Sequence, residues 1–574
     1  MAKGASKSVV EMLECREALV NTDELEAATE VARRRVLEIQ AKLHRWARDD
    51  PHRRFDDVFN LVADPAFLLV AWDRVRHNKG AKTAGVDGQS AYYVQAVLGV
   101  EEFLDRLRTA LRDRSFRPVP VREQMIPKAG GKQRRLGIAT VTDRVVQASL
   151  TLVLEPILEA DFLPCSYGFR PGRRAHDAIA EARYLATRSY EWIVEGDITA
   201  CFDEIAHPAL MDRLRMRIAD KRVLALVKAF LKAGILGQDG ALRENTMGVP
   251  QGGILSPVLA NLALSVLDEH IAQMPGGPDS SQSQRATRRR KGLGNYRLVR
   301  YADDWLLMVS GTREHAEHMR GRAAAALAPM GLRLSAEKTK ITHIDDGLDF
   351  LGWRIQRHRK RGTNRYYVYT YPSRKAIKAV TLKVKTICRR NVNQPLQTLL
   401  RRLNPALRGW CAYFKPGVSS VAFSDLANYT LDRFLRWARR KHRRITVKTI
   451  RRRYCNSGWW PATPEIGLFN PDEVRTTRYR YRGAAVPTPW PGHRMNHHSS
   501  RNGTCGARCR DDRHAGFGRR LGETDRSKYR QGAPSRPHTY SSGRPAPCPK
   551  SKLFGITPAK RSCACWLATV AAVT

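Results

Sequence analysis

The most constraining feature of the sequence is Tyr301-Ala302-Asp303-Asp304, a short acidic segment framed by apolar residues. Leu298-Val299 precede it, and the run from Trp305 to Val309 follows it. Two apolar runs on either side of a polar turn predict a β-hairpin that carries adjacent carboxylates at its tip. Neighbouring ionised carboxylates repel each other, so such a tip is best tolerated when a cation lies between them. The alternative is an ordinary polar turn, because Asp is common in turns.

A second acidic segment favours the cation-binding interpretation. Residues 191–198 predict a strand that ends at Asp197, and Asp203 follows six residues later. A site that joins nucleotides needs carboxylates from separate strands, which hold two Mg²⁺ ions roughly 3.5–4 Å apart. One ion would lower the pKa of the primer 3′-hydroxyl, and the other would hold the triphosphate.

The two acidic segments together predict a set of metal ligands. We expect Asp197 and Asp303 to bridge two Mg²⁺ ions, with Asp304 as the supporting ligand; Mn²⁺ is the alternative ion. Ile198 belongs to the same predicted metal set. Asp203 is an alternative ligand, but we assign it a structural or helix-capping role.

The charge balance indicates a polyanionic partner. Lys and Arg number 100 against 55 Asp and Glu, which gives a formal net charge of +45. Such an excess repels itself unless a polyanion neutralises it, and nucleic acid is the usual candidate. Passive RNA-binding proteins share this signature, so the charge predicts a partner but no reaction.

Length, cysteines and apolar runs set broader limits. A chain of 574 residues predicts two to four domains. The cysteines up to Cys455 stand singly, which is typical of reduced thiols rather than of a secreted disulfide framework. No apolar run approaches the roughly 20 residues that span a bilayer, so we expect a cytoplasmic protein without membrane contact.

The hydrophobic pattern divides the chain into four parts. Residues 1–60 predict an N-terminal helical segment, and residues 61–360 mix short strands with helices. Residues 370–470 are helical and very basic. Residues 480–574 are rich in Gly, Pro, Ser, Arg and His, which favours a mostly disordered basic tail.

Local signals place three elements inside the mixed part. Ser256 followed by Pro257 predicts a helix start, with the serine as the capping residue. A further helix is expected from about Glu314 to Leu327, ending at Gly331. The Gly/Ser/Arg-rich residues 276–292 between these helices predict a solvated surface excursion.

Further motifs occur in a fixed order along the chain: Asn78-Lys79-Gly80-Ala81, Gly85-Val86-Asp87-Gly88, Ile126-Pro127-Lys128, residues 134–138, residues 143–147, residues 166–173, residues 248–257, Lys338-Thr339 and Phe350-Leu351-Gly352. This order resembles the reverse transcriptase domain of proteins encoded by bacterial group II introns. The resemblance implies an α/β, right-hand polymerase with fingers and palm over residues 61–360. It also implies an α-helical thumb/maturase domain, called domain X, over residues 370–470.

The resemblance also implies a nucleotide pocket. Lys128 and Arg134 would neutralise the incoming triphosphate, since cationic donors suit phosphate oxygens. Gln251 would shape the pocket, and Gly252 would let the backbone pass close to nucleotide or template. The remaining pocket residues are Phe202 and Lys338.

Phe202 is expected to distinguish between polymerase classes. It lies five residues after Asp197, where the resemblance places a side chain beneath the nucleotide sugar. A bulky ring there would clash with a 2′-hydroxyl and favour deoxynucleotides. Lys338 is expected to steady the primer end or the triphosphate, although an exposed helix lysine is the plainer interpretation.

The basic helices after residue 370 predict an RNA-binding surface. Cations suit the RNA backbone, and aromatic rings suit unstacked bases. A thumb that only holds the primer–template duplex is the plainer alternative. The expected RNA-binding residues are Arg408, Trp410, Tyr413, Arg439, Arg440 and Lys441.

The tail departs from the fuller intron proteins, which often end in an HNH-type endonuclease. Cys505 and Cys509 are poorly spaced for a zinc knuckle with Cys563 and Cys565. We therefore expect no endonuclease domain, only weak DNA binding by a basic tail.

The family resemblance implies a mobile genetic element's enzyme. Its expected partners are the intron RNA, an RNA template with a DNA primer, deoxynucleoside triphosphates and target DNA, used in splicing and retrohoming. Two alternatives stay open at this point: a splicing-only, RNA-binding maturase, and a reverse transcriptase of another bacterial retroelement. The oligomeric state is not predicted.

Overall fold

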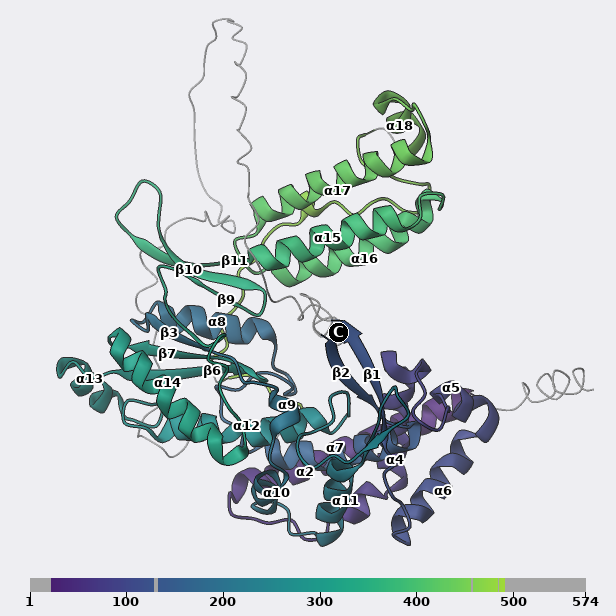
Figure 1. The fold of residues 1–574 in the computed structure, drawn as a ribbon, viewed down its shortest axis with the longest axis vertical. Helices are drawn as coiled ribbons and strands as arrows, with labels where there is room; N and C mark the ends of the chain where they lie inside the picture. Colours follow the sequence, from purple (N-terminus) through teal and green to yellow (C-terminus); the bar gives the residue numbers. More distant parts are fainter. Residues whose placement is uncertain (1–21, 128–132, 456–457, 484, 491–574) are drawn as a thin grey trace, which may run out of the picture. The chain divides into compact units, whose positions relative to one another are not determined.

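The acidic hairpin forms one side of a four-stranded antiparallel sheet (Figure 1). The computed structural model describes residues 22–127, 133–455, 458–483 and 485–490, all of which belong to one compact unit. The sheet has the order β6-β7-β3-β8. Its strands are β6 (Asn295–Tyr301), β7 (Asp304–Ser310), β3 (Trp192–Gly196) and β8 (Lys340–His343).

Helices cover both faces of this palm sheet, which explains why β7 is apolar without interruption from Trp305 to Val309. Helices α12 (Ser256–Gln273) and α14 (Arg313–Leu327) pack on one face, where Leu307 and Val309 join the larger hydrophobic core. Helix α8 (Ala175–Ala186) packs on the other face, where Leu306 and Met308 join a second core. The alternation of side chains along β7 therefore separates the two cores.

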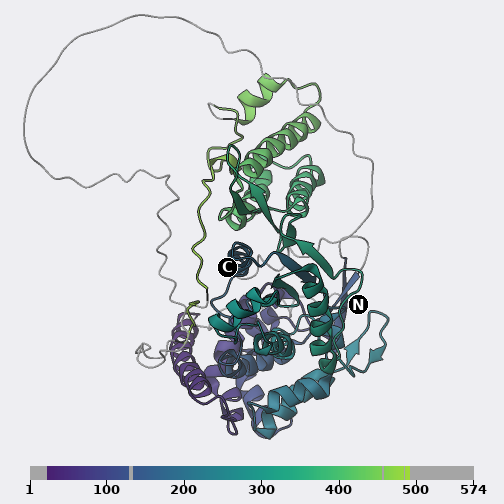
Figure 2. The ribbon, with the colours of Figure 1, turned by 90° about the vertical axis from the view of Figure 1, so that its left-hand side faces the viewer.

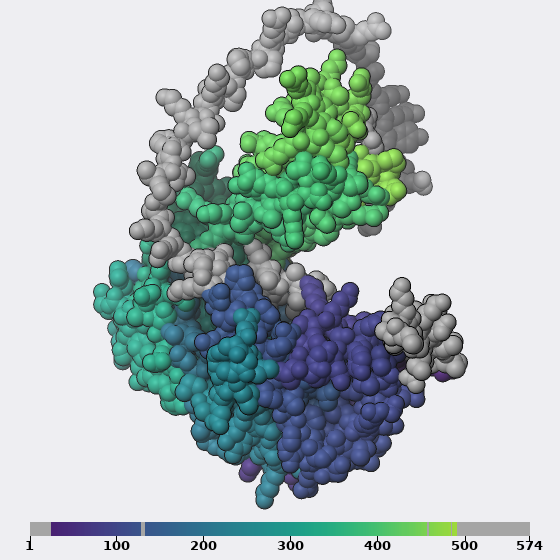
Figure 3. All heavy atoms as spheres, turned by 45° about the vertical axis from the view of Figure 1, so that its right-hand side comes forward, coloured from purple at the N-terminus to yellow at the C-terminus, as the bar shows by residue number. Residues whose placement is uncertain are grey.

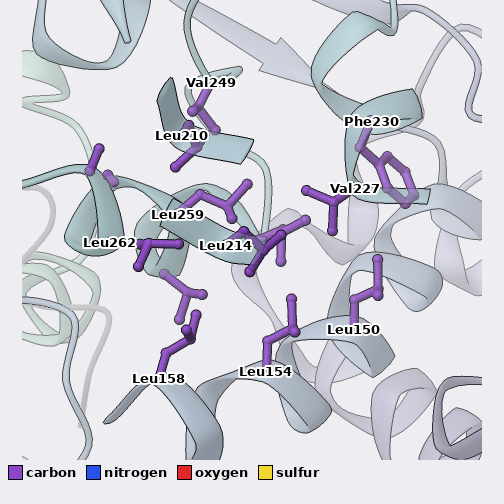
Figure 4. Packing of buried hydrophobic residues seen from close by; sticks show 14 of the residues in the cluster. Leu150, Leu154, Leu158, Leu210, Leu214, Val227, Phe230, Val249, Leu259 and Leu262 are labelled. Atoms are coloured by element: carbon purple, nitrogen blue, oxygen red, sulfur yellow. The ribbon is translucent and has the colours of Figure 1, made fainter. Parts of the chain in front are cut away.

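The larger core extends into the N-terminal helices. Helices α2 (Thr22–Asp49) and α4 (Pro65–His77) both pack against α7 (Val141–Glu159). Figure 4 shows Leu150, Leu154 and Leu158, spaced four residues apart on α7, pointing toward Leu214 and Leu259. In Figure 3 the purple and blue atoms of the N-terminal elements form one continuous surface on the face shown. The other elements of this half are α3 (Phe59–Val62), α5 (Ala91–Tyr93), α6 (Val100–Arg112), α10 (His207–Arg215) and α11 (Lys221–Lys232).

The fingers carry a second sheet, with the order β2-β1-β4-β5. Strands β1 (Val121–Pro127) and β2 (Gln133–Ile138) form an antiparallel hairpin. The short strands β4 (Ile235–Leu236) and β5 (Leu242–Arg243) complete the sheet. The loop of the β1–β2 hairpin, with Lys128, lies outside the described residues.

A three-stranded sheet and four helices follow the palm. Strands β9 (Leu348–Phe350), β10 (Trp353–Arg359) and β11 (Tyr366–Pro372) pair in the order β11-β10-β9. Helix α15 (Arg374–Arg390) packs against both α16 (Leu396–Phe414) and α17 (Ser420–Lys441), and α18 (Val447–Tyr454) follows. Leu399, Leu403 and Leu407 form part of the apolar stripe of α16 in the second core.

Residues 475–483 and 485–490, here called the strap, connect distant parts of the fold. The backbone N–H of Thr477 donates to the Lys415 carbonyl at the end of α16. Tyr479 and Arg482 contact Asp177 on α8, and the indole N–H of Trp490 donates to Gln40 on α2. Figure 2 shows this yellow-green segment running from the thumb helices to the purple helix α2. The tail expected from residue 480 therefore begins with packed residues, and residues 491–574 lie outside the described part.

Two local expectations need correction, and a third is met. Leu255, not Ser256, is the N-cap of α12, because the Ser256 hydroxyl donates to the Pro250 carbonyl instead. The excursion at residues 276–292 is exposed but contains a helix, α13 (Gln282–Arg290), which begins with a Ser281–Gln284 capping box. Helix α14 is followed by a single 3₁₀ turn that ends at Gly331, as the sequence predicted.

The described cysteines Cys165, Cys201, Cys388, Cys411 and Cys455 are all unpaired. Within the described part of the chain, no helix has the length and apolar character needed to cross a membrane.

The strap supplies a testable prediction. Asp177 is 2% exposed, and the Arg482 guanidinium lies 2.5 Å from its carboxylate. Arg482→Ala should destabilise the protein by about 1–3 kcal/mol, because it leaves a buried carboxylate without its ion-pair partner. Hydrogen exchange of the strap peptides should speed up, and the melting temperature should fall. Arg480→Ala, an exposed arginine of the same segment, is the matched control. Equal exchange in the two variants would contradict the role of this pair.

Candidate active site

Strand pairing brings the three predicted carboxylates together. Gly196 at the end of β3 pairs with Trp305 in β7, so Asp197 lies next in register to Asp304. Asp304 in turn pairs with Tyr301 across the hairpin, and Asp303 lies in the turn between them. The predicted acidic hairpin and the predicted strand before Asp197 are both confirmed.

The electrostatics of the site agree with this proximity. Burial, then the negative charges of Asp303 and Asp197, raise the pKa of Asp304 to about 8, while Lys338 lowers it. The Lys338 ammonium lies 2.9 Å from Asp197 Oδ1 and so places a cation at the edge of the carboxylates. Mutual repulsion of this kind disappears when a cation binds between the carboxylates.

These residues fit a divalent ion by their chemistry. Carboxylate oxygens from separate strands are the ligands that Mg²⁺ prefers. Asp304 is held in a setting that disfavours its charge, and Lys338 already stands where positive charge is stabilised. Among the described residues, however, no three His, Cys, Asp or Glu side chains already form a metal cage. Ile198 is buried and its backbone bridges to Leu334.

Two glycines allow the close packing behind the carboxylates. A Cβ on Gly196 would overlap the Trp305 ring, which lies across the end of β3. A Cβ on Gly168 would overlap the backbone nitrogen of Ala302 in the acidic turn. The segment around Gly168 therefore lies directly against the turn, and the Tyr167 N–H donates to the Arg300 carbonyl. Ala302 itself has a φ of 57°, so the turn depends on support from its surroundings.

A buried ion pair supplies that support. Arg300 is completely buried in β6, and its guanidinium donates to both carboxylate oxygens of Asp268 on α12, at 2.7 and 2.5 Å. The same guanidinium donates to Asn261 Oδ1 at 3.0 Å and to the Ala302 carbonyl at 3.2 Å. The Asn261 amide then donates to the Gly168 carbonyl at 2.9 Å. One network thus joins β6, α12, the Gly168 segment and the acidic turn.

Sequence reasoning missed this network. Arg300 lies in a strand whose other central residues are apolar, and Asp268 lies on an apolar helix. A charge in such a position needs a buried partner, which was the available signal. The sequence does not show which of the chain's many opposite charges is that partner.

A hydrogen-bonded chain joins the fingers to the palm beside the carboxylates. Arg134 Nε on β2 donates to Gln251 Oε1 at 2.6 Å. Gln251 Nε2 donates to the Asp203 carboxylate at 3.0 and 3.1 Å. Asp203 is the third residue of the short helix α9 (Cys201–Glu204), whose N-cap is Ala200. Asp203 is therefore not the N-cap of this helix, and its contact with Gln251 agrees with the structural alternative of the expected role.

The other predicted pocket residues lie around this chain. Phe202 is half-buried and packs on the larger core. Gly252 has a φ of +108°, and a Cβ there would come within 2.9 Å of the Gly137 carbonyl. The backbone of Gly252 therefore passes close to the fingers strand β2. This contact alone is enough to require glycine, without a nucleotide or template.

The predicted RNA-binding residues of the thumb fall into two groups. Arg408, Arg439 and Arg440 are exposed. Trp410 is 6% exposed and packs against Phe414 and Phe423 in the second core. A ring in that position cannot stack on a base, so the expected RNA contact of Trp410 is wrong.

Tyr413 and Lys441 also have structural partners. The Tyr413 hydroxyl donates to the Leu351 carbonyl at 2.8 Å, and its ring packs against His176 and Trp353. This packing argues against an RNA-binding role for the ring. Lys441 is half-buried, and its ammonium donates to the Gln394 carbonyl at 2.7 Å.

Comparison with known proteins identifies these parts. Residues 126–355 match the family model "Reverse transcriptase (RNA-dependent DNA polymerase)", and residues 377–455 match "Group II intron, maturase-specific domain". Protein YkfC of Escherichia coli is 38% identical over 359 residues, which are 59% of this chain and 93% of YkfC. The chain belongs to the group II intron-encoded reverse transcriptase/maturase family. It is an RNA-directed DNA polymerase by family, with the reverse transcriptase domain containing all three carboxylates and the maturase domain covering α15 to α18.

Two further relatives carry intron names. The group II intron-encoded protein LtrA of Lactococcus lactis is 32% identical over 354 residues, which are 54% of this chain and 58% of LtrA. An uncharacterised 91 kDa protein in the cob intron of Schizosaccharomyces pombe is 31% identical over 373 residues, which are 56% of this chain and 45% of that protein. The match therefore spans about half the length of these two relatives.

The buried ion pair of this reverse transcriptase supplies a second prediction. Asp268→Ala should destabilise the fold by about 3–5 kcal/mol, because it leaves the Arg300 charge buried and unpaired. Glu317→Ala, which breaks an exposed pair with Arg313 on α14, should cost less than about 1 kcal/mol. Thermal unfolding measures both.

A double variant separates stability from positioning. Arg300→Met with Asp268→Leu should recover much of the lost stability, since apolar residues can replace a buried pair. DNA synthesis should stay low, because the Ala302 carbonyl has lost its donor. Full activity in a stable double variant would show that the network does not position the turn.

Proposed function

We propose that this protein copies RNA into DNA at the Asp197, Asp303 and Asp304 cluster, using two Mg²⁺ ions. We also propose that its thumb/maturase domain binds the intron RNA that encodes the protein, to assist splicing and retrohoming. The observation that carries the proposal is the convergence of three carboxylates from two strands beside the Arg134–Gln251–Asp203 chain.

Each side chain has a distinct part in this scheme. The ions, when bound to the carboxylates, activate the primer 3′-hydroxyl and neutralise charge on the departing pyrophosphate. Lys338 places its ammonium 2.9 Å from Asp197 Oδ1 and so sets a positive charge at the edge of the carboxylates. The Arg134 guanidinium lies next to Gln251 and donates to it through Nε. Its other N–H groups can donate hydrogen bonds to the oxygens of a triphosphate.

Sugar selection is assigned to Phe202. The backbone of Phe202 is held by the Val249 N–H, which donates to its carbonyl at 2.6 Å. Its ring packs against the larger core on one side and is half-exposed. A ring packed against the core beside the site would clash with a 2′-hydroxyl, which supports selection of deoxynucleotides.

The RNA contacts of the maturase domain are assigned to its exposed cations. Arg408, Arg439 and Arg440 project from α16 and α17, and phosphate neutralisation by such residues is salt-dependent. Target DNA and deoxynucleoside triphosphates complete the proposed set of partners.

Primer extension tests the polymerase proposal. The native protein should extend a DNA primer on a generic RNA template with deoxynucleotides and Mg²⁺, and only weakly with ribonucleotides. Asp303→Asn should reduce extension by on the order of 100-fold or more, because it removes a carboxylate from the metal site. Asp239→Asn, in an exposed turn between β4 and β5, is the matched control. A folded native protein that extends nothing would leave a splicing-only maturase as the better hypothesis.

Metal binding can be tested without activity. Adding Mg²⁺ should raise the melting temperature of the native protein, because the ion offsets the burial and the carboxylate repulsion that together raise the pKa of Asp304. Asp304→Asn should reduce this Mg²⁺-dependent shift, whereas Asp239→Asn should retain it. A shift of equal size in Asp304→Asn would show that Mg²⁺ binds elsewhere.

A further inference from the structure

The hairpin formed by β10 and β11 has one buried face and one open face. Trp353, Ile355 and Val368 are at most 4% exposed and belong to the second core. Because side chains alternate along a strand, the intervening residues lie on the opposite face. These residues pair in register: Arg354 with Tyr371, Gln356 with Tyr369 and His358 with Tyr367.

The open face carries a row of three tyrosines. Tyr367 is 43% exposed, and Tyr369 and Tyr371 are half-buried. The ring centroids of Tyr367 and Tyr369 lie 6.5 Å apart, and the His358 ring lies 6.1 Å from those of both Tyr369 and Tyr371. These rings belong to neither hydrophobic core, so packing within the described protein does not explain the row.

Hydrogen bonds hold one end of this row, at Tyr371, in place. The Tyr371 hydroxyl donates to Gln356 Oε1 at 2.8 Å and lies 3.3 Å from His358 Nε2. Gln356 in turn donates to the Asp345 carbonyl at 2.8 Å. The Tyr371 end of the row is therefore fixed before anything binds, and a fixed side chain loses little freedom on binding.

The tip of the same hairpin is strongly basic. Arg359, Lys360, Arg361 and Arg365 are all exposed. Arg359 Nε donates to the uncharged Thr363 carbonyl at 2.8 Å. Among the described residues, the ion pairs of this hairpin are formed by Arg354 and Arg357 at its base and not by the tip cations. In Figure 1 the tip extends away from α8 and the palm strands.

Rings in a row beside unpaired cations match the chemistry of an unpaired nucleic-acid strand. Bases stack on aromatic side chains, and the backbone phosphates between them contact Arg and Lys. A purely acidic protein partner would use the cations but would leave the three rings unexplained. A duplex would present phosphates but no unstacked base.

We propose that the open face of the β10–β11 hairpin is a stacking platform for an unpaired stretch of RNA. Tyr367 and Tyr369 would each accept a base, and Lys360, Arg361 and Arg365 at the tip would contact the phosphates. The choice of RNA as the ligand rests on the proposed function. The platform is separate from the carboxylate site and from the exposed arginines of α16 and α17.

The test uses the full chain and an unstructured, fluorescein-labelled 12-nucleotide RNA that contains 4-thiouridine. Photo-crosslinking followed by mass spectrometry should locate crosslinks in the β11 peptide. Tyr367→Ala with Tyr369→Ala should abolish those crosslinks. It should also weaken binding, measured by fluorescence anisotropy, by about fivefold or more for each ring removed.

Two control variants isolate stacking. Tyr366→Ala removes a 62% exposed ring from the same strand but from the opposite face, so it should change binding less than twofold. Tyr367→Phe with Tyr369→Phe should retain binding, because the rings remain. Melting curves confirm that each variant is folded.

Several outcomes would overturn the proposal. They are unchanged affinity in the alanine pair, an equal loss in Tyr366→Ala, or no crosslink in β11. Tighter binding of the matching DNA strand, lost in the same variant, would reassign the platform to single-stranded DNA. A native protein without primer extension would refute the proposed function, whereas the crosslink map decides the platform whichever result extension gives.

Discussion

The position of the acidic turn depends on the buried pair of Arg300 and Asp268. Burying two charges is costly, and the cost is offset only when the geometry satisfies both groups. Here the Arg300 guanidinium donates to both carboxylate oxygens of Asp268 and also to Asn261 Oδ1 and the Ala302 carbonyl. The network therefore ties the backbone next to Asp303 to helix α12 and strand β6, and so fixes its position. On the other side of the same turn, the backbone of Gly168 packs directly against the backbone of Ala302.

At the carboxylate site, this rigid framework holds together three carboxylates that repel one another. Asp304 is held by the hairpin register in a partly buried place where two other carboxylates disfavour its charge. Lys338 offsets part of this repulsion from the Asp197 side. A rigid framework keeps the carboxylates from moving apart. Their mutual repulsion therefore persists in the metal-free protein, and a bound cation relieves it. The fingers are joined to the palm by the hydrogen-bonded chain Arg134–Gln251–Asp203. Unlike the buried Arg300–Asp268 network, this chain is partly exposed.

The sequence predicted the elements that local patterns determine. The acidic hairpin, the strand before Asp197 and the helix after Ser256 follow from apolar runs, turn residues and a proline, and each is present. The Arg300–Asp268 pair could not be predicted, because 32 residues separate the two partners and many other charges compete. The capping role expected of Ser256 was wrong, and the partner of Asp203 could not be named, for a related reason: each side chain has a non-local or loop partner that local spacing does not reveal.

Aromatic residues show most clearly where composition misleads. Trp410 lies in a basic, aromatic-rich stretch, which suggested RNA contact. Its spacing with Leu403, Leu407 and Phe414 follows the helical repeat, and that spacing places it in the core. Tyr367, Tyr369 and Tyr371 instead alternate along a strand whose other face is buried, so their alternation leaves them on the open side. In this protein the periodicity of an aromatic residue decides whether it stabilises the fold or is available to a base, and local charge does not.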